Sequence, residues 1–217
     1  MFETDADAMT ATALHRSPFE GHVAGAQASA TGHVGVHLRA ETLPGLLLLA
    51  TWPAGTADLE RALASGLPLL AKAPPGRTGQ VIELAQGLLL MRTGPHEFLL
   101  VSRTGQPTAA DLRLHVPAEV GSVTDLGNAR CRIRIEGDRC QASLSKLFAL
   151  DLREAHFPVG ELRLTGHHHV PCTLHRRGSD RFDLYVLSTY AHDQLATVLD
   201  AAREFGASLE LGSNLTG

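Results

Sequence analysis

The sequence is poor in the features that mark several classes of protein. It has only 3 cysteines in 217 residues, Cys131, Cys140 and Cys172, and no CxxC pair, so it lacks a disulfide framework and fits a reducing compartment best. Aromatic residues make up 5% of the chain, so its core must consist largely of Leu, Val, Ala and Ile. The longest apolar run, Leu46–Ala50, is far too short to cross a bilayer.

An excess of positive charge is absent as well. The formal net charge is −4, whereas proteins that bind nucleic acid present a basic stripe to the phosphates. The first ten residues, MFETDADAMT, are acidic and contain no apolar segment of the kind that a secretory signal requires. We therefore expect a cytoplasmic protein that binds neither nucleic acid nor membrane.

Motifs for catalysis or cofactor binding are missing too. The sequence contains no GxGxxG, P-loop, HExxH or GxSxG pattern. Asp125, next to Thr124 at the end of an expected strand, could present a carboxylate, but an Asp after a strand usually makes a turn. No catalytic, cofactor-binding or metal-ligating residue is therefore assigned on this chain.

The clearest secondary-structure pattern runs from Ser122 to Gly206. Arg130, Arg132 and Arg134 alternate with apolar residues, which predicts a half-buried strand with an arginine face that is solvated or forms a protein interface. A helix follows, with Asp138 as its expected cap. Further elements are expected in this order: a strand over 161–176 that Pro171 interrupts, a turn over 177–180, a strand over 182–187 and a helix over 188–205.

The first half shows the same order of elements. The expected elements are strands over 34–40 and 46–52, a helix from Thr56, strands over 81–91 and 98–102, a helix that Thr108 and Asp111 cap together, and a closing strand over 122–126. Residues 1–32 hold almost no large apolar residues, so we expect a mobile arm or one that orders on a partner, with Phe19 as a possible anchor.

The two halves are related by an offset of 84 residues. Gly94–Phe98 resembles Gly178–Phe182, and the same offset pairs Leu63 with Leu147 and Leu100 with Leu184. The predicted fold class is α+β: two tandem strand–helix–strand–strand–helix halves with antiparallel sheets, related by a pseudo-twofold axis. The expected division is an arm over 1–32, a first half over 33–121 and a second half over 122–217.

One cluster of residues resembles a metal site. His167 to His169 precede Cys172 and His175, and on an extended strand His167 and His169 would share one face. The spacing matches no standard zinc pattern, and Pro171 breaks the period before Cys172. We therefore expect the histidines to lie on an exposed or subunit-facing strand without a metal.

The order of several short motifs resembles the gamma subunit of heterotetrameric sarcosine oxidase. The resemblance covers most of the chain beyond the arm. The motifs are Arg16-Ser17-Pro18, Gly94–Val101, Val123–Leu126, Ile135–Arg139, Leu150–Leu152, Phe157–Gly160, Leu174–Arg176, Phe182–Val186 and Ser188–Ala191. Each motif is weak alone, but their order and spacing are specific.

This resemblance implies a non-catalytic partner in an enzyme complex of one-carbon metabolism. The complex oxidatively demethylates sarcosine to glycine with FAD, FMN, NAD and tetrahydrofolate, none of which is implied for this chain itself. The implied partners are the alpha, beta and delta subunits of a heterotetramer. The implied fold is similar to the folate-binding module of the glycine-cleavage T-protein.

Two other functions stay open at this point. The first is a stand-alone folate-binding, aminomethyltransferase-like domain, for which Asp125 is the loose candidate for a carboxylate near the pterin. The second is a structural metal-binding module built on the histidine run.

Overall fold

The computed structural model describes residues 17–53, 55–66 and 74–212, without the side chains of 63–66. The strands are β1 (Gly25–Gln27), β2 (Val36–Thr42), β3 (Gly45–Thr51), β4 (Val81–Glu83), β5 (Leu89–Gly94), β6 (Glu97–Ser102), β7 (Gly121–Asp125), β8 (Arg130–Glu136), β9 (Leu162–His167), β10 (Val170–Gly178), β11 (Arg181–Leu187) and β12 (Ala207–Leu211). The helices are α1 (Thr56–Gly66), α2 (Ala109–Arg113), α3 (Cys140–Leu144) and α4 (Ala191–Ala202), with 3₁₀ turns at Ala85–Gly87, Ser188–Tyr190 and Arg203–Phe205.

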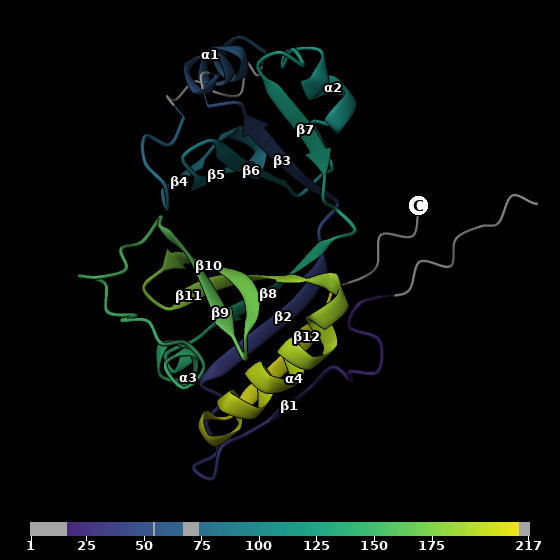
Figure 1. Ribbon diagram of the computed structural model, residues 1–217. Helices are drawn as coiled ribbons and strands as arrows, with labels where there is room; N and C mark the ends of the chain where they lie inside the picture. The colour runs from purple at the N-terminus through teal and green to yellow at the C-terminus, as the bar shows by residue number, and fades with distance from the viewer. Residues whose placement is uncertain (1–16, 54, 67–73, 213–217) are drawn as a thin grey trace, which may run out of the picture.

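The strands form two sheets that pack face to face. One has seven strands in the order β1-β12-β2-β8-β11-β10-β9, and the other has five in the order β4-β5-β6-β3-β7. Figure 1 shows the five-stranded sheet above the seven-stranded one, with α1 and α2 on the upper outer side and α3 and α4 on the lower one. The α+β class with largely antiparallel sheets is thus confirmed; β12 and β2 pair in parallel.

Each sheet buries apolar side chains on both of its faces. The largest cluster lies between the seven-stranded sheet and α3 and α4, and contains Ile133, Ile135, Leu184 and Leu195. A second lies between the five-stranded sheet and α1 and α2. A third lies between the sheets and contains Leu43, Leu46, Leu89, Met91, Leu99, Val101, Leu162 and Tyr185. The four layers are therefore helices, sheet, sheet and helices.

The hairpins of the two halves confirm the 84-residue repeat. Arg92 pairs with Phe98 in β5–β6, and Arg176 pairs with Phe182 in β10–β11. Each hairpin then shifts register at the same point, between Arg92 and Gly94 and between Arg176 and Gly178. Both phenylalanines are fully buried, as the repeat predicts. The side chain of Leu63, which the repeat pairs with Leu147, lies outside the described residues.

The halves exchange their first strands. β2 begins the first half but pairs with β8 of the second, and β7 begins the second half but pairs with β3 of the first. The expected boundary between 121 and 122 is therefore not a boundary between sheets. The sequence did not predict β1 or β12, which widen the seven-stranded sheet beside β2.

Parts of the expected arm and helices differ from the sequence prediction. Residues 17–32 lie on the fold, since Phe19 is 3% exposed in the largest core cluster and β1 pairs with β12. Residues 1–16 lie outside the described part. Helix α3 begins after Arg139 without a side-chain cap, and Asp138 instead contacts His33 Nε2 at 3.0 Å. The predicted capping box of Thr108 and Asp111 on α2 is confirmed.

None of the helices among the described residues has the length and apolar character needed to span a bilayer.

Candidate functional site

The first residue of the histidine run ends a strand, and the other two form a tight turn. β9 ends at His167, β10 begins at Val170, and these two residues pair across the hairpin. His168 and His169 connect them with φ of 48° and 66°, in the left-handed region that two-residue hairpin turns of type I′ require. The predicted interruption at Pro171 is wrong, because Pro171 lies within β10 opposite Gly166.

The side chains that a metal site on the histidine run would need lie apart in this hairpin. His167 is buried on the helix side, where its Nδ1 lies 2.9 Å from Gln194 Oε1 and its ring contacts Phe148. Cys172 belongs to the apolar core, whereas His175 lies on the opposite face of the sheet beside Asp183. In residues 17–53, 55–66 and 74–212, no group of three or more His, Cys, Asp or Glu side chains could hold a metal ion.

Asp125 has the turn role that an Asp after a strand usually has. Its Oδ1 accepts a hydrogen bond of 2.8 Å from the backbone N–H of Gly127, directly after β7. The side chain is exposed. This hydrogen bond gives the Asp125 carboxylate a structural role in the turn.

The three cysteines are buried, free thiols. Burial raises the pKa of Cys131 and of Cys140 to about 12 and that of Cys172 to about 11. Because the thiolate is the reactive form, these side chains are poor nucleophiles at neutral pH.

The predicted arginine face is buried at its centre. Arg132 is 4% exposed, and its Nε donates a 2.9 Å hydrogen bond to Glu41 Oε1 on the neighbouring strand β2. Arg130 and Arg134 are half-buried. We define the charged face as the side of the seven-stranded sheet that faces away from α3 and α4. Its polar residues are His37, Arg39, Glu41, Arg132, Arg134, Glu136, Thr173, His175, Arg177, Arg181, Asp183, Tyr185, Ser208 and Glu210.

Asp183 is the centre of the buried part of the charged face. Its side chain is fully buried, its Oδ1 accepts a 3.2 Å hydrogen bond from Arg134 Nε, and Nη1 atoms of Arg132 and Arg177 lie 3.6 Å from its Oδ2. A buried carboxylate is tolerated when cations surround it in this way. The sequence prediction missed Asp183, although its place between Phe182 and Leu184 in an alternating strand puts it on the same face as the arginines.

The pKa values of two side chains beside Asp183 are shifted from their usual range. Burial lowers the pKa of His175 to about 4, so the imidazole is neutral at pH 7. Burial also raises the pKa of Tyr185 far above its usual range, with the Asp183 carboxylate adding to the shift. His175 Nδ1 and the Tyr185 hydroxyl have no hydrogen-bond partner in the described part of the chain. His175, Asp183 and Tyr185 are therefore buried polar side chains that solvent does not reach.

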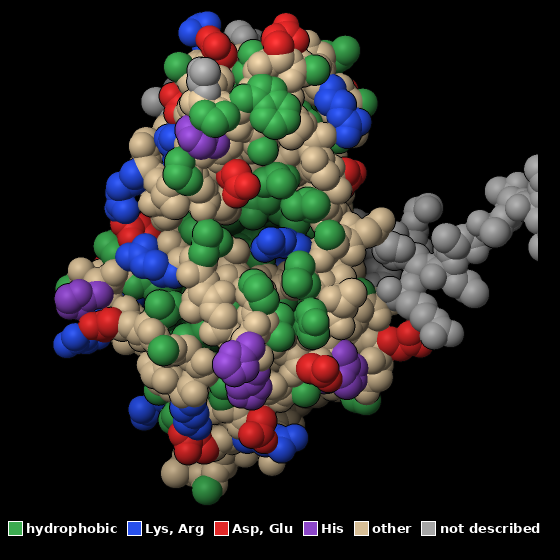
Figure 2. All heavy atoms as spheres, viewed as in Figure 1, with side chains coloured by type: hydrophobic (Ala, Val, Ile, Leu, Met, Phe, Trp, Pro, Cys, Tyr) green, Lys and Arg blue, Asp and Glu red, His purple; other side chains and the backbone are tan. Residues whose placement is uncertain are grey.

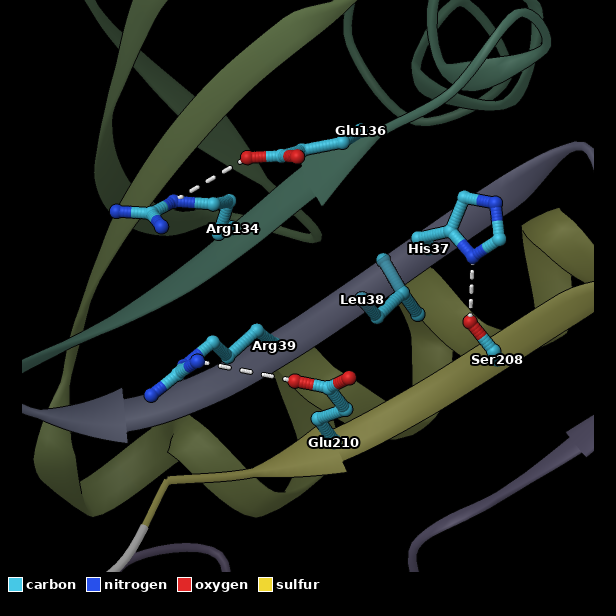
Figure 3. Close-up of a pocket in the computed structure, with 7 residues that line it drawn as sticks. All are labelled: His37, Leu38, Arg39, Arg134, Glu136, Ser208 and Glu210. Atoms are coloured by element: carbon cyan, nitrogen blue, oxygen red, sulfur yellow. Dashed lines mark hydrogen bonds and ion pairs between the residues drawn. The ribbon is translucent and has the colours of Figure 1, made fainter.

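The outer part of the charged face is open and holds a pocket of about 230 Å³ (Figure 3). Arg39 Nη1 lies 3.7 Å from Glu210 Oε2, and Arg134 Nε lies 3.5 Å from Glu136 Oε1. His37 Nδ1 lies 2.8 Å from Ser208 Oγ. The lining residues are His37, Leu38, Arg39, Arg134, Glu136, Ser208 and Glu210. Guanidinium and imidazole groups at such a place can bind an anion or a protein surface.

Charges of both signs are mixed on the surface. In the view of Figure 2, basic and acidic side chains alternate around the molecule, and apolar side chains lie between them near the middle. A basic stripe for nucleic acid is not seen on this face, in agreement with the negative net charge.

No family model matches the chain. It is 28% identical over 201 residues to sarcosine oxidase subunit gamma of Corynebacterium sp. (strain U-96), which spans 91% of this chain and 94% of that protein. The chain is a homologue of the sarcosine oxidase gamma subunit. The shared length means that the likeness to the gamma subunit extends over both halves of the fold.

Solved structures agree with this relationship. A chain of the heterotetrameric sarcosine oxidase from Corynebacterium sp. U-96, in complex with pyrrole 2-carboxylate, superposes with a TM-score of 0.72 and 26% identity, over 88% of this chain and 96% of that one. The glycine cleavage system aminomethyltransferase T from Bartonella henselae superposes with a TM-score of 0.60 and 18% identity, over 82% of this chain and 48% of that one. The gamma-subunit homologue thus has the fold of about half of that aminomethyltransferase.

Proposed function

We propose that this chain is the gamma subunit of a sarcosine-oxidase-like heterotetramer and that it acts by assembly and not by catalysis. The observation that carries the proposal is the near full-length likeness to a gamma subunit in both sequence and structure. The partners would be alpha, beta and delta subunits. The complex would be cytoplasmic and would demethylate sarcosine to glycine by oxidation.

The cofactors of the complex would lie on the other subunits. FAD, FMN, NAD and tetrahydrofolate are the groups that the family relationship implies for the complex. On this chain, the described residues offer neither a dinucleotide-binding motif nor a cluster of metal ligands. The thiols are buried with raised pKa values, and Asp125 is engaged in a turn. These features support a subunit without a cofactor or catalytic site.

A folate-binding activity of the isolated chain is the weaker alternative. The likeness to aminomethyltransferase T is one of fold at 18% identity and spans only 48% of that protein. The same fold supports different functions, so it does not carry a folate site to this chain.

Co-expression tests the proposal directly. This chain, co-expressed with the other subunits of its oxidase, should elute with them on gel filtration, and omitting it should lower the yield or stability of the complex. The chain alone should have no oxidase activity, no flavin absorbance and no retention of tritiated folate. If the other subunits assemble and oxidise sarcosine equally well without this chain, and it never co-elutes with them, the proposed role is wrong.

A further inference from the structure

Two arginines of the charged face stand directly opposite each other. Arg39 on β2 pairs with Arg134 on β8 in the antiparallel register. Like charges in directly opposed positions destabilise a sheet. Both side chains line the open pocket, as Figure 3 shows. The two guanidinium groups therefore need acidic groups beside them, and Glu41, Glu210, Glu136 and Asp183 supply these within the chain.

The two arginines are only partly paired within the chain. The Arg39 side chain makes no hydrogen bond with any described residue, and its contacts with Glu41 and Glu210, at 3.5 and 3.7 Å, are long ion pairs. Arg134 uses its Nε for Asp183 and Glu136, at 3.2 and 3.5 Å. The Nη groups of Arg134 and most donors of Arg39 therefore have no close acceptor among residues 17–53, 55–66 and 74–212. They can bind an acceptor on another molecule.

A third donor or acceptor belongs to the same pocket. His37 lies two residues before Arg39 on β2 and so shares its side of the sheet. Ser208 Oγ lies 2.8 Å from His37 Nδ1 and fixes the ring, while His37 Nε2 has no partner in the part of the chain that the structure describes. The pocket thus combines two guanidinium groups and one imidazole from the neighbouring strands β2 and β8, and Ser208 of β12 orients the imidazole.

We propose that the Arg39–Arg134 pair binds the carboxylate of an Asp or Glu side chain presented by a neighbouring subunit; this rests on the subunit role proposed above. A guanidinium binds a carboxylate through two parallel N–H···O bonds, and Arg residues are enriched among the side chains that dominate binding energy at interfaces. A carboxylate between Arg39 and Arg134 would also remove their repulsion.

The flanking acids favour a carboxylate on a docked protein over a free anion. Glu136 and Glu210 line the same pocket and balance the charges of Arg39 and Arg134. A free anion entering a neutral pocket gains little from the long-range field. A carboxylate fixed on a docked surface shares the entropy cost of association with the rest of the interface, so local hydrogen bonds are sufficient to hold it.

The test uses substitutions that leave the fold intact. Arg39 is half-exposed without a hydrogen bond, so Arg39→Gln should leave the thermal midpoint of the isolated chain unchanged within the surface range. Arg39→Lys keeps the charge but cannot bind a carboxylate bidentately. The control is Arg203→Gln, an exposed arginine paired with Asp200 at the end of α4.

Affinity for the other subunits is measured by surface-immobilised binding at two salt concentrations. We expect Arg39→Gln to weaken binding by about 30-fold or more, Arg39→Lys to fall between this variant and the natural chain, and Arg203→Gln to bind normally. Added salt should weaken the natural chain more than Arg39→Gln. If Arg39→Gln binds as tightly as the natural chain, the carboxylate site is wrong and the subunit role stands.

Two further outcomes also decide the matter. If the natural chain does not bind the other subunits, the subunit role fails, and the carboxylate site fails with it. Inorganic phosphate titrated into the isolated chain by calorimetry should give no saturable heat. Saturable binding that Arg39→Gln abolishes would assign the pocket to a free anion and overturn the proposal.

Discussion

The guanidinium of Arg176 lies over the ring of Phe182, with its central carbon 5.3 Å from the ring centroid. Its counterpart, Arg92, lies 5.1 Å from the centroid of Phe98. Each arginine is the cross-strand partner of its phenylalanine and packs on it by a cation–π contact. The equivalent strands β6 and β11 therefore begin with the same packing in the two halves, although the sequences of the halves differ at most other positions.

This shared packing predicts that both phenylalanines are essential for stability. Phe98→Ala and Phe182→Ala should each lower the free energy of unfolding by about 3–5 kcal/mol, because the lost transfer energy and the cavity add. Urea denaturation followed by circular dichroism measures the loss. Leu164→Ala is the control, since Leu164 is 57% exposed and its substitution should change the free energy by less than about 0.5 kcal/mol. Equal losses at Phe98 and Leu164 would contradict the packing.

Substitutions in the turn at His168 and His169 are predicted to stabilise the protein. Both residues hold positive φ, which costs a β-carbon-bearing residue energy and suits Asn-Gly in a two-residue turn. The double substitution His168→Asn, His169→Gly should therefore raise the free energy of unfolding, by about 0.5–1 kcal/mol. Thermal and urea unfolding measure it. A clear loss of stability would mean that the imidazoles have a structural role that the turn geometry does not reveal.

We predict that the histidine run binds no metal ion. Gln194 occupies Nδ1 of His167, and Cys172 and His175 lie on opposite faces of the sheet. Elemental analysis of protein that carries no affinity tag should give far less than one metal per chain. Stoichiometric zinc that disappears in the double variant His167→Ala, His169→Ala would show that the turn rearranges to bind it.

Asp183 is predicted to be the most sensitive charged residue. Removing one member of a buried ion network leaves its partners unpaired, so Asp183→Ala should cost about 3–5 kcal/mol of unfolding free energy. Asp200→Ala is a matched control on the surface of α4, because the Asp200 side chain is 73% exposed and its ion pair with Arg203 contributes little. If both variants are equally stable, solvent reaches the site of Asp183.

Stability is predicted to fall between pH 6.5 and pH 5. The pKa of His175 is about 4 in the fold and near 6.5 in the unfolded chain, so the unfolded chain takes up the proton first. The stability is full above about pH 6.5 and decreases as pH falls towards 4, by about 3 kcal/mol across the whole window. Burial lowers the pKa of His167 in the same direction.

The variant His175→Asn isolates this effect. Its unfolding free energy should change less with pH between 7 and 5 than that of the natural chain, and the slope that remains should come from His167. Acidic groups with lowered pKa values, such as Glu161, lose their contribution only at more acidic pH and do not interfere in this window. An unchanged slope in His175→Asn would show that His175 is solvated in the fold.

The sequence predicted those parts of the fold that local pattern determines. The repeat, the buried phenylalanines and the capping box of α2 depend on neighbours in the chain, and all are confirmed. The pairing of β2 with β8 depends on residues far apart in the sequence, and alternation alone does not choose between possible partners. The predicted interruption at Pro171 was wrong for a related reason. Pairing of β10 with β11 begins only at Cys172, so the missing N–H of Pro171 removes no hydrogen bond between these strands.

The candidate site was predictable only in part. The arginine face is visible in the alternation of residues 130–135, but its acidic partners Glu41 and Asp183 come from β2 and β11. The opposition of Arg39 and Arg134 appears only once the exchange of strands sets these two residues side by side.

The strand exchange also governs how the chain must fold as it is synthesised. β2 leaves the ribosome early, but its partners β8 and β12 follow only after the strands β3 to β6 have been made. Its apolar residues, among them Val36 and Leu38, are therefore unpaired while the first half collapses. Pairing between distant segments is slow, because loop closure must precede the contacts that reward it. The seven-stranded sheet is thus completed only when β12 has been made, and a chain truncated before β8 should aggregate because β2 has none of its partner strands.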